Sequence, residues 1–207
     1  MGASRYSVII PSYNAASTLG DCLRALNACS PKPTEIIVVN DCSLDGTSDV
    51  ARQHGAIVVD SATNLGPSNA RNQGASQASA EILVFIDADI VVKPDVFERL
   101  SAFFLAYPEA DGVSGTYSES CPAASDFSQY KNLYLVQSFA WITGPIGMVN
   151  TSFSAIKKEV FDASGGFNIN WRLGEDAVYG ASLIDSGYRL FLCHDIQVEH
   201  LKEYTSL

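Results

Sequence analysis

The chain has 207 residues, with 23 Asp and Glu against 13 Lys and Arg, which gives a net charge of −10. This acidity argues against a nucleic-acid partner, because the phosphate backbone requires a basic face. A hydrophobic content of 47% with only 17% charged residues excludes a disordered chain and predicts a compact protein with a sizeable core.

The cysteines and the apolar segments restrict the class of protein further. Five cysteines, without any CxxC pair, argue against a disulfide framework and favour a reducing, cytosolic compartment. Zinc is disfavoured because only Cys193 and His194 lie close together in the sequence. The most apolar stretch, 136–156, is interrupted by Gln, Gly, Pro and Asn, so we expect no transmembrane helix there.

The first 90 residues alternate between predicted strands and helices. Short apolar runs rich in β-branched residues predict strands at Tyr6–Pro11, Glu35–Asn40, Ala56–Asp60 and Ile82–Asp87. Helical patterns lie between them, at Leu19–Leu26 with Ser17 or Thr18 as N-cap, at Thr47–His54 and at Ser68–Ser79. The order βαβαβαβ predicts an α/β fold with a parallel sheet and right-handed crossovers.

The second half of the chain has a different character. We expect helices at Asp95–Tyr107, near Asp126–Phe139 and at Glu175–Asp185, and strands at Val113–Tyr117, Thr151–Ile156 and Ile196–Glu199. Without a repeat or a low-complexity linker, one domain of two parts is favoured over two independent domains.

Polar residues follow three of the predicted strands. In open parallel sheets, ligands bind at the carboxyl ends of the strands. We therefore expect Ser12-Tyr13-Asn14, Asp41-Cys42-Ser43 and Asp87-Ala88-Asp89 to line one crevice.

The sharpest local pattern is the pair of carboxylates at Asp87 and Asp89. Their mutual repulsion is costly unless a cation lies nearby, and oxygen ligands of this kind suit Mg²⁺ or Mn²⁺. The alternative interpretation is a solvated turn at the end of a strand. His200 also has two interpretations: it is either a third metal ligand or an ordinary turn residue.

Asp41 and Arg71 are two further candidates for contact with a ligand. Asp41 lies where a base or a ribose of a ligand could donate a hydrogen bond to it, whereas nearby Asp45 or Thr47 is expected to cap a helix. Arg71, near the start of a helix, is either a phosphate ligand or part of a surface ion pair.

A second carboxylate pair, Glu175 and Asp176, opens a predicted helix. Acidic residues there interact favourably with the helix dipole, so capping is one interpretation. The other is a general base, whose pKa an apolar neighbour such as Trp171 could raise.

No GxGxxG, GxxxxGK[ST] or GxSxG motif is present, which disfavours dehydrogenases, P-loop enzymes and α/β-hydrolases. Taken together, the ordered segments resemble the family 2 glycosyltransferases of the GT-A fold. The matching segments are Val8–Asn14, Glu35–Thr47, Asn64–Gly74, Phe85–Asp89, Val160-Phe161, Gly165–Phe167, Glu175-Asp176 and Gly187–Arg189. The resemblance covers nearly the whole chain.

The resemblance implies a GT-A, Rossmann-like α/β/α sandwich with a mostly parallel sheet, and inverting sugar transfer from a nucleotide-diphosphate donor. Residues about 1–92 would form the nucleotide-binding half and about 93–207 the acceptor-binding half of a single catalytic domain. By analogy, the donor would be bound by Pro11, Tyr13, Asn14, Asp41, Arg71, Asp87, Ala88 and Asp89. Asp89 and His200 would hold Mg²⁺ or Mn²⁺, Asp176 would be the general base, and Glu175 and Trp171 would contact the acceptor.

The expected partners are a nucleotide-diphospho-sugar, with a UDP-sugar as the default, and a glycan or lipid-linked acceptor. No QxxRW motif follows Asp176, which disfavours processive polymer synthesis. Membrane-anchored relatives continue past the position of Leu207, so we hypothesise a catalytic domain from a longer protein, cytoplasmic or peripheral at the cytoplasmic face of the membrane. Two alternatives stay open: a degenerate sugar-nucleotide-binding module, and a nucleotidylyltransferase.

Overall fold

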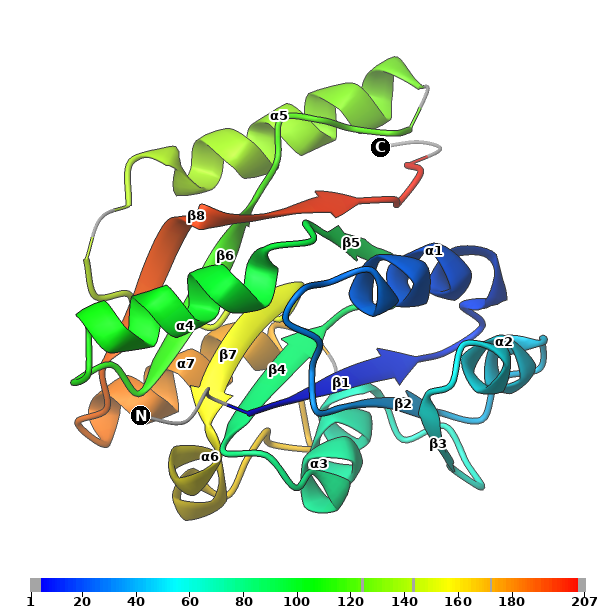
Figure 1. Cartoon of the computed structure of the whole chain (residues 1–207), viewed down its shortest axis with the longest axis horizontal. Coiled ribbons are helices and arrows are strands. Elements are labelled where there is room, and N and C mark those ends of the chain that lie inside the picture. The colour runs from blue at the N-terminus through cyan, green and yellow to red at the C-terminus, as the bar shows by residue number, and fades with distance from the viewer. Residues whose placement is uncertain (1–4, 124, 143, 172, 205–207) are drawn as a thin grey trace.

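A computed structural model describes residues 5–123, 125–142, 144–171 and 173–204 (Figure 1). The strands are β1 (Tyr6–Ser12), β2 (Glu35–Asn40), β3 (Ile57–Asp60), β4 (Ile82–Ile86), β5 (Ile90–Val92), β6 (Gly112–Tyr117), β7 (Phe153–Lys157) and β8 (Leu190–His200). The helices are α1 (Ala16–Asn27), α2 (Thr47–Gln53), α3 (Pro67–Gln77), α4 (Val96–Ala106), α5 (Asp126–Ala140), α6 (Lys158–Ser164) and α7 (Glu175–Asp185).

All eight strands form one sheet in the order β3-β2-β1-β4-β7-β6-β8-β5. The expected βαβαβαβ unit is confirmed, because β1 pairs in parallel with both β2 and β4, and β2 with β3. Strands β1 and β4 are buried almost throughout, as strands covered on both faces should be.

Beyond β4 the sheet becomes mixed. Strand β7 runs antiparallel to β4 and β6, β5 runs antiparallel to β8, and β6 and β8 are parallel. The sheet is therefore mostly parallel, as expected. Three features were missed: β5, helix α6, and the length of β8, for which we expected only Ile196–Glu199.

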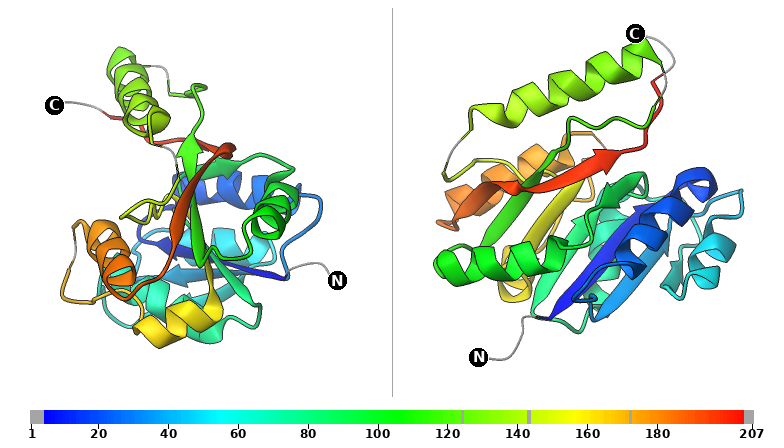
Figure 2. Two further views of the ribbon diagram at one scale, coloured as in Figure 1. Left: turned by 90° about the vertical axis from the view of Figure 1, so that its left-hand side faces the viewer. Right: turned by 45° about the horizontal axis from the view of Figure 1, so that its top comes forward.

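Helices cover both faces of the sheet. In Figures 1 and 2, α1 and α4 lie on one face, and α3, α6 and α7 lie on the other, while α5 lies beside β6 and β8. This arrangement confirms the α/β/α sandwich. No helix within the described ranges is long and apolar enough to cross a bilayer.

Close packing fixes α3 on β1. A Cβ atom at Gly74 would lie 2.5 Å from Cγ2 of Ile9, so only glycine allows this approach. The prediction that Ser17 or Thr18 caps the first helix is wrong, because α1 begins at Ala16. Its first turn is capped from the next loop instead, since the Asp45 carboxylate accepts the Ala16 N–H at 3.1 Å.

Candidate donor-binding site

A cavity of about 1230 Å³ opens at the carboxyl edge of the parallel strands. Its lining includes nine of the predicted site residues: Pro11, Tyr13, Asn14, Asp41, Arg71, Asp87, Ala88, Asp89 and His200. The loops after β1, β2 and β4 thus converge as the strand-end rule predicts. The prediction was wrong for Cys42 and Ser43, which are not among the lining residues. Glu175, Asp176 and Trp171 are not among the residues that line this cavity.

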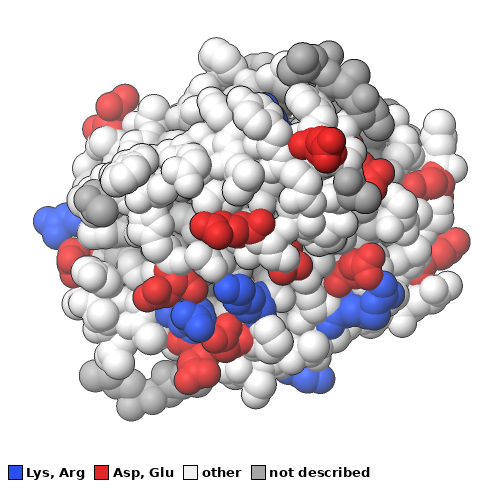
Figure 3. Space-filling view, turned by 90° about the horizontal axis from the view of Figure 1, so that it is seen from above, with Lys and Arg blue, Asp and Glu red and all other residues white. Residues whose placement is uncertain are grey.

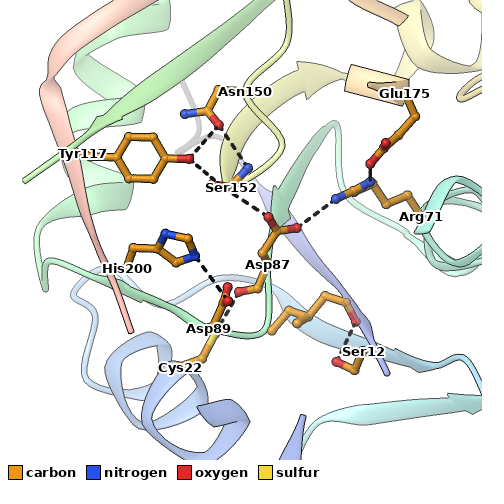
Figure 4. A network of polar contacts seen from close by, with 11 residues as sticks. Ser12, Cys22, Arg71, Asp87, Asp89, Tyr117, Asn150, Ser152, Glu175 and His200 are labelled. Carbon is orange, nitrogen blue, oxygen red and sulfur yellow. Dashed lines mark hydrogen bonds and ion pairs between the residues drawn. The ribbon is translucent and has the colours of Figure 1, made fainter. Parts of the chain in front are cut away.

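Asp87 and Asp89 sit in the turn that follows β4, where the Ile90 N–H bonds to the Asp87 carbonyl at 3.2 Å. The two carboxylates have different partners (Figure 4). Asp87 accepts from Arg71 and from Ser152, whereas Asp89 lies 3.2 Å from His200. A cationic or donor group at each carboxylate therefore offsets the repulsion between them.

Arg71 joins the two acidic clusters. Its guanidinium donates at 2.8 Å to Asp87 through Nη2 and at 2.8 Å to Glu175 through Nη1. The side chain is only 3% exposed and lies over the ring of Phe167. The surface-ion-pair interpretation of Arg71 is therefore wrong: it forms a buried ion triad that ties α3 to α7.

Burial raises the pKa of Asp87 above its ordinary value, and the charge of Arg71 opposes this shift. Burial also favours a higher pKa for Asp89. The hydrogen bond with His200 and the charges of His200 and Lys202 outweigh it and hold the Asp89 pKa below the ordinary value. Asp89 is thus kept as a carboxylate facing the cavity, the form that binds cations.

His200 ends β8, opposite Ile90 of β5, and its Nε2 lies 3.2 Å from Asp89 Oδ2. The turn-residue interpretation is wrong because the sheet itself places this ring on the cavity wall. No group of three His, Cys, Asp or Glu side chains in the described part of the chain is arranged to hold a metal ion. One carboxylate and one imidazole nevertheless fit Mg²⁺ or Mn²⁺, which commonly completes its coordination with water and substrate phosphates.

At the other side of the cavity, Asp41 is 4% exposed and organises the loop before α3. Its two carboxylate oxygens accept the N–H groups of Leu65 and Gly66 at 2.9 and 2.7 Å. Asn14, with a left-handed φ of 49°, accepts the Leu44 N–H at 2.9 Å. These bonds hold the two loops that flank this part of the cavity.

The N-terminus of α7 contacts Arg71 through Glu175. Glu175 is 12% exposed and faces Arg71, while the Asp176 carboxylate accepts the N–H of Ala177 at 2.8 Å. Trp171 is half-exposed, and its carbonyl accepts the Ser68 hydroxyl at 3.0 Å, which ties this loop to α3.

Two groups in this region escaped the sequence reasoning. The Tyr117 hydroxyl donates to Ser152 at 2.8 Å, and Ser152 donates to Asp87 at 3.2 Å (Figure 4). Lys202 also lines the cavity, next to Asp89 and His200. Ser152 and Tyr117 lie 65 and 30 residues from Asp87 in the sequence, so no local pattern indicates that they are linked to it by hydrogen bonds. Lys202, near the end of the chain, belongs to no recognised motif.

The family model described as glycosyl transferase family 2 matches residues 7–165. Among curated relatives, glycosyltransferase AglE of Haloferax volcanii is 29% identical over 202 residues, which span 92% of this chain and 64% of the relative. O-antigen chain rhamnosyltransferase WbaN of Salmonella anatum is 26% identical over 213 residues, which span 97% of this chain and 67% of the relative. The chain thus spans about two thirds of the length of these relatives.

Solved structures share the fold. TarS 1–349 of S. aureus in complex with UDP-GlcNAc has a TM-score of 0.77 at 20% identity, covering 98% of this chain and 60% of that one. The mannosyltransferase PcManGT of Pyrobaculum calidifontis, in complex with GDP-Man and Mn²⁺, has a TM-score of 0.77 at 24% identity. The match covers 100% of this chain and 59% of that one. The likeness shows that the chain has the fold of these glycosyltransferases.

Proposed function

This chain belongs to glycosyl transferase family 2, and we propose that it transfers a sugar, with inversion, from a nucleotide-diphosphate donor to a hydroxyl or phosphate acceptor. The observation that carries the proposal is the meeting of Asp41, Asp87, Asp89 and His200 in one cavity at the carboxyl edge of the sheet. That edge is where nucleotides bind in open α/β sheets.

The donor would lie along the cavity from Asp41 to Asp89. The nucleobase would contact Asp41, with Pro11, Tyr13 and Asn14 forming the rest of its pocket, and the ribose would contact Asp87 beside Ala88. A UDP-sugar is our first choice of donor, and the UDP-GlcNAc complex of TarS supports it, although PcManGT binds GDP-Man.

Mg²⁺ or Mn²⁺ would be held by Asp89 and His200, and the Mn²⁺ complex of PcManGT supports a divalent cation. When bound, such an ion neutralises negative charge on a departing diphosphate. The chain itself supplies little positive charge for that task, since its net charge is −10.

Asp176 would act as the general base on the acceptor hydroxyl, with Glu175 and Trp171 near the acceptor. Inversion requires the base and the leaving group on opposite sides of the sugar. Arg71 connects Asp87, on the donor side, with Glu175, the neighbour of Asp176, so the helix that carries the proposed base is tied to the donor site. The first half of the chain would then hold the donor, and residues about 93–207 the acceptor.

We propose a role in cell-envelope polysaccharide, glycolipid or polyprenyl-phosphate synthesis at the cytoplasmic face of the membrane. The relationship to an O-antigen rhamnosyltransferase supports it.

A catalytically degenerate sugar-nucleotide-binding module is the second candidate. Family members often carry Asn at the position of Phe153, and this departure is the reason to consider such a module. Phe153 is fully buried in strand β7. A nucleotidylyltransferase is third, because the loop after β1 lacks a Gly-rich phosphate loop with a Lys.

The test is isothermal titration of UDP, GDP and their common sugar conjugates, each with and without Mn²⁺, into the wild type and Asp89→Ala. We expect one nucleotide to bind in a metal-dependent way and Asp89→Ala to lose the metal dependence. If no nucleotide binds under either condition, the donor site is refuted. Binding without any turnover when acceptors are supplied would favour the degenerate module.

A further inference from the structure

The electrostatic balance of the donor cavity is unfavourable for a diphosphate. Five carboxylate residues line it: Asp21, Asp41, Asp87, Asp89 and Glu203. Only two residues of the lining, Arg71 and Lys202, are Arg or Lys. The surface seen in Figure 3 likewise shows acidic side chains among the basic ones and no continuous basic patch over its described residues.

Arg71 is already engaged. Its two terminal nitrogens each donate to a carboxylate, Asp87 and Glu175, and its guanidinium is almost fully buried over Phe167. The single positive charge of Arg71 is already offset by these two carboxylates, so Arg71 adds little net positive charge to the cavity.

Lys202 is placed differently. It is exposed, lines the cavity beside Asp89 and His200, and has no carboxylate within ion-pair distance among the described residues. Its Nζ lies 5.4 Å from the ring centroid of Tyr204, a contact that leaves the ammonium donors free for a ligand.

The segment that carries Lys202 is anchored on both sides. The Leu201 N–H donates to the Asp89 carbonyl at 2.8 Å, and the Tyr204 N–H donates to the Ser128 hydroxyl at 2.9 Å. Lys202 and Glu203 therefore line the cavity from a short segment, 201–204, whose ends are held by the Asp87–Asp89 turn and by α5.

We propose that Lys202 contacts the diphosphate of the donor and stabilises the negative charge that develops on it as the sugar leaves. This assignment rests on the proposed function, since it presumes a nucleoside diphosphate in this cavity. The Lys202 ammonium, on a flexible four-carbon stem beside Asp89 and His200, can keep its contact with the diphosphate as the bond to the sugar breaks. No bond to the lysine forms or breaks in this step.

The test compares diphosphate with monophosphate binding. UDP and UMP, or GDP and GMP, are titrated in the same buffer with Mn²⁺ into the wild type, Lys202→Ala, Lys202→Arg and Lys131→Ala. Lys131 is the matched control, because its Nζ also lies over a tyrosine ring, that of Tyr134, but it does not line the cavity.

We expect Lys202→Ala to weaken the diphosphate about 10-fold or more, as for loss of a charged hydrogen bond, and the monophosphate much less. Lys202→Arg should restore most of the affinity, and Lys131→Ala should match the wild type. Equal weakening of both nucleotides, or no weakening, would overturn the role of Lys202 while leaving the donor site intact. Failure of the wild type to bind any of the four nucleotides would overturn both.

Discussion

Removal of the guanidinium at Arg71 should destabilise the protein far more than removal of an exposed one. Arg71→Met keeps an unbranched apolar side chain over Phe167 but leaves two carboxylates without their partner. Of these, Glu175 is 12% exposed and Asp87 is 31% exposed. Breaking a buried ion pair in this way costs about 3–5 kcal/mol.

We expect the lower end of that range, about 3 kcal/mol, because Asp87 faces the cavity and can recruit water. For a chain of this length the loss corresponds to a fall in Tm of about 6–12 °C. The assay is urea unfolding followed by circular dichroism, with the free energy of unfolding extrapolated to water.

The matched control is Arg52→Met, since Arg52 is 54% exposed and pairs with Asp60 at the surface. Its loss should cost no more than about 1 kcal/mol. Adding Glu175→Gln to Arg71→Met removes one of the stranded charges and should recover part of the stability. If Arg71→Met is as stable as Arg52→Met, the buried triad does not hold α3 to α7 and the reasoning is refuted.

Two further predictions concern packing and thiol chemistry. Gly74→Ala should cost about 1–3 kcal/mol in urea unfolding because its Cβ would meet Ile9, whereas Gly46→Ala, with open space around it, should stay within about 0.5 kcal/mol of wild type. Equal stabilities would contradict the packing of α3 on β1. Burial, with the nearby charge of Asp95, raises the pKa of Cys29 to about 11. In the native protein at pH 8, iodoacetamide should therefore modify the partly exposed Cys42 well before Cys29, as read by peptide mass spectrometry, and equal rates would contradict the burial.

The first half of the fold could be predicted because its signals are local. Buried parallel strands are apolar along their whole length, so β1, β2 and β4 were placed to within one residue. Strand β5 has only three residues, directly after the Asp87–Asp89 turn, and it exists because β8 pairs with it. Such pairing between distant segments leaves no periodicity to detect.

The site residues also fall into two groups, those with a local sequence signal and those placed only by tertiary packing. Asp41, Asp87 and Asp89 follow strands, so their convergence could be predicted from the strand-end rule. That Arg71 is buried between Asp87 and Glu175 could not, because the pairing depends on how α7 docks against α3. The hydroxyl chain from Tyr117 through Ser152 to Asp87 joins β6, the loop before β7 and the turn after β4, and only the tertiary fold brings these together.

A crystal structure of the protein with Mn²⁺ and the nucleoside diphosphate selected by titration would test the central claim most directly. We predict the base beside Asp41, the diphosphate between Asp89 and Lys202, and the metal ion on Asp89 and His200. A nucleotide bound outside the cavity, or a metal ion on other residues, would contradict the proposed donor site.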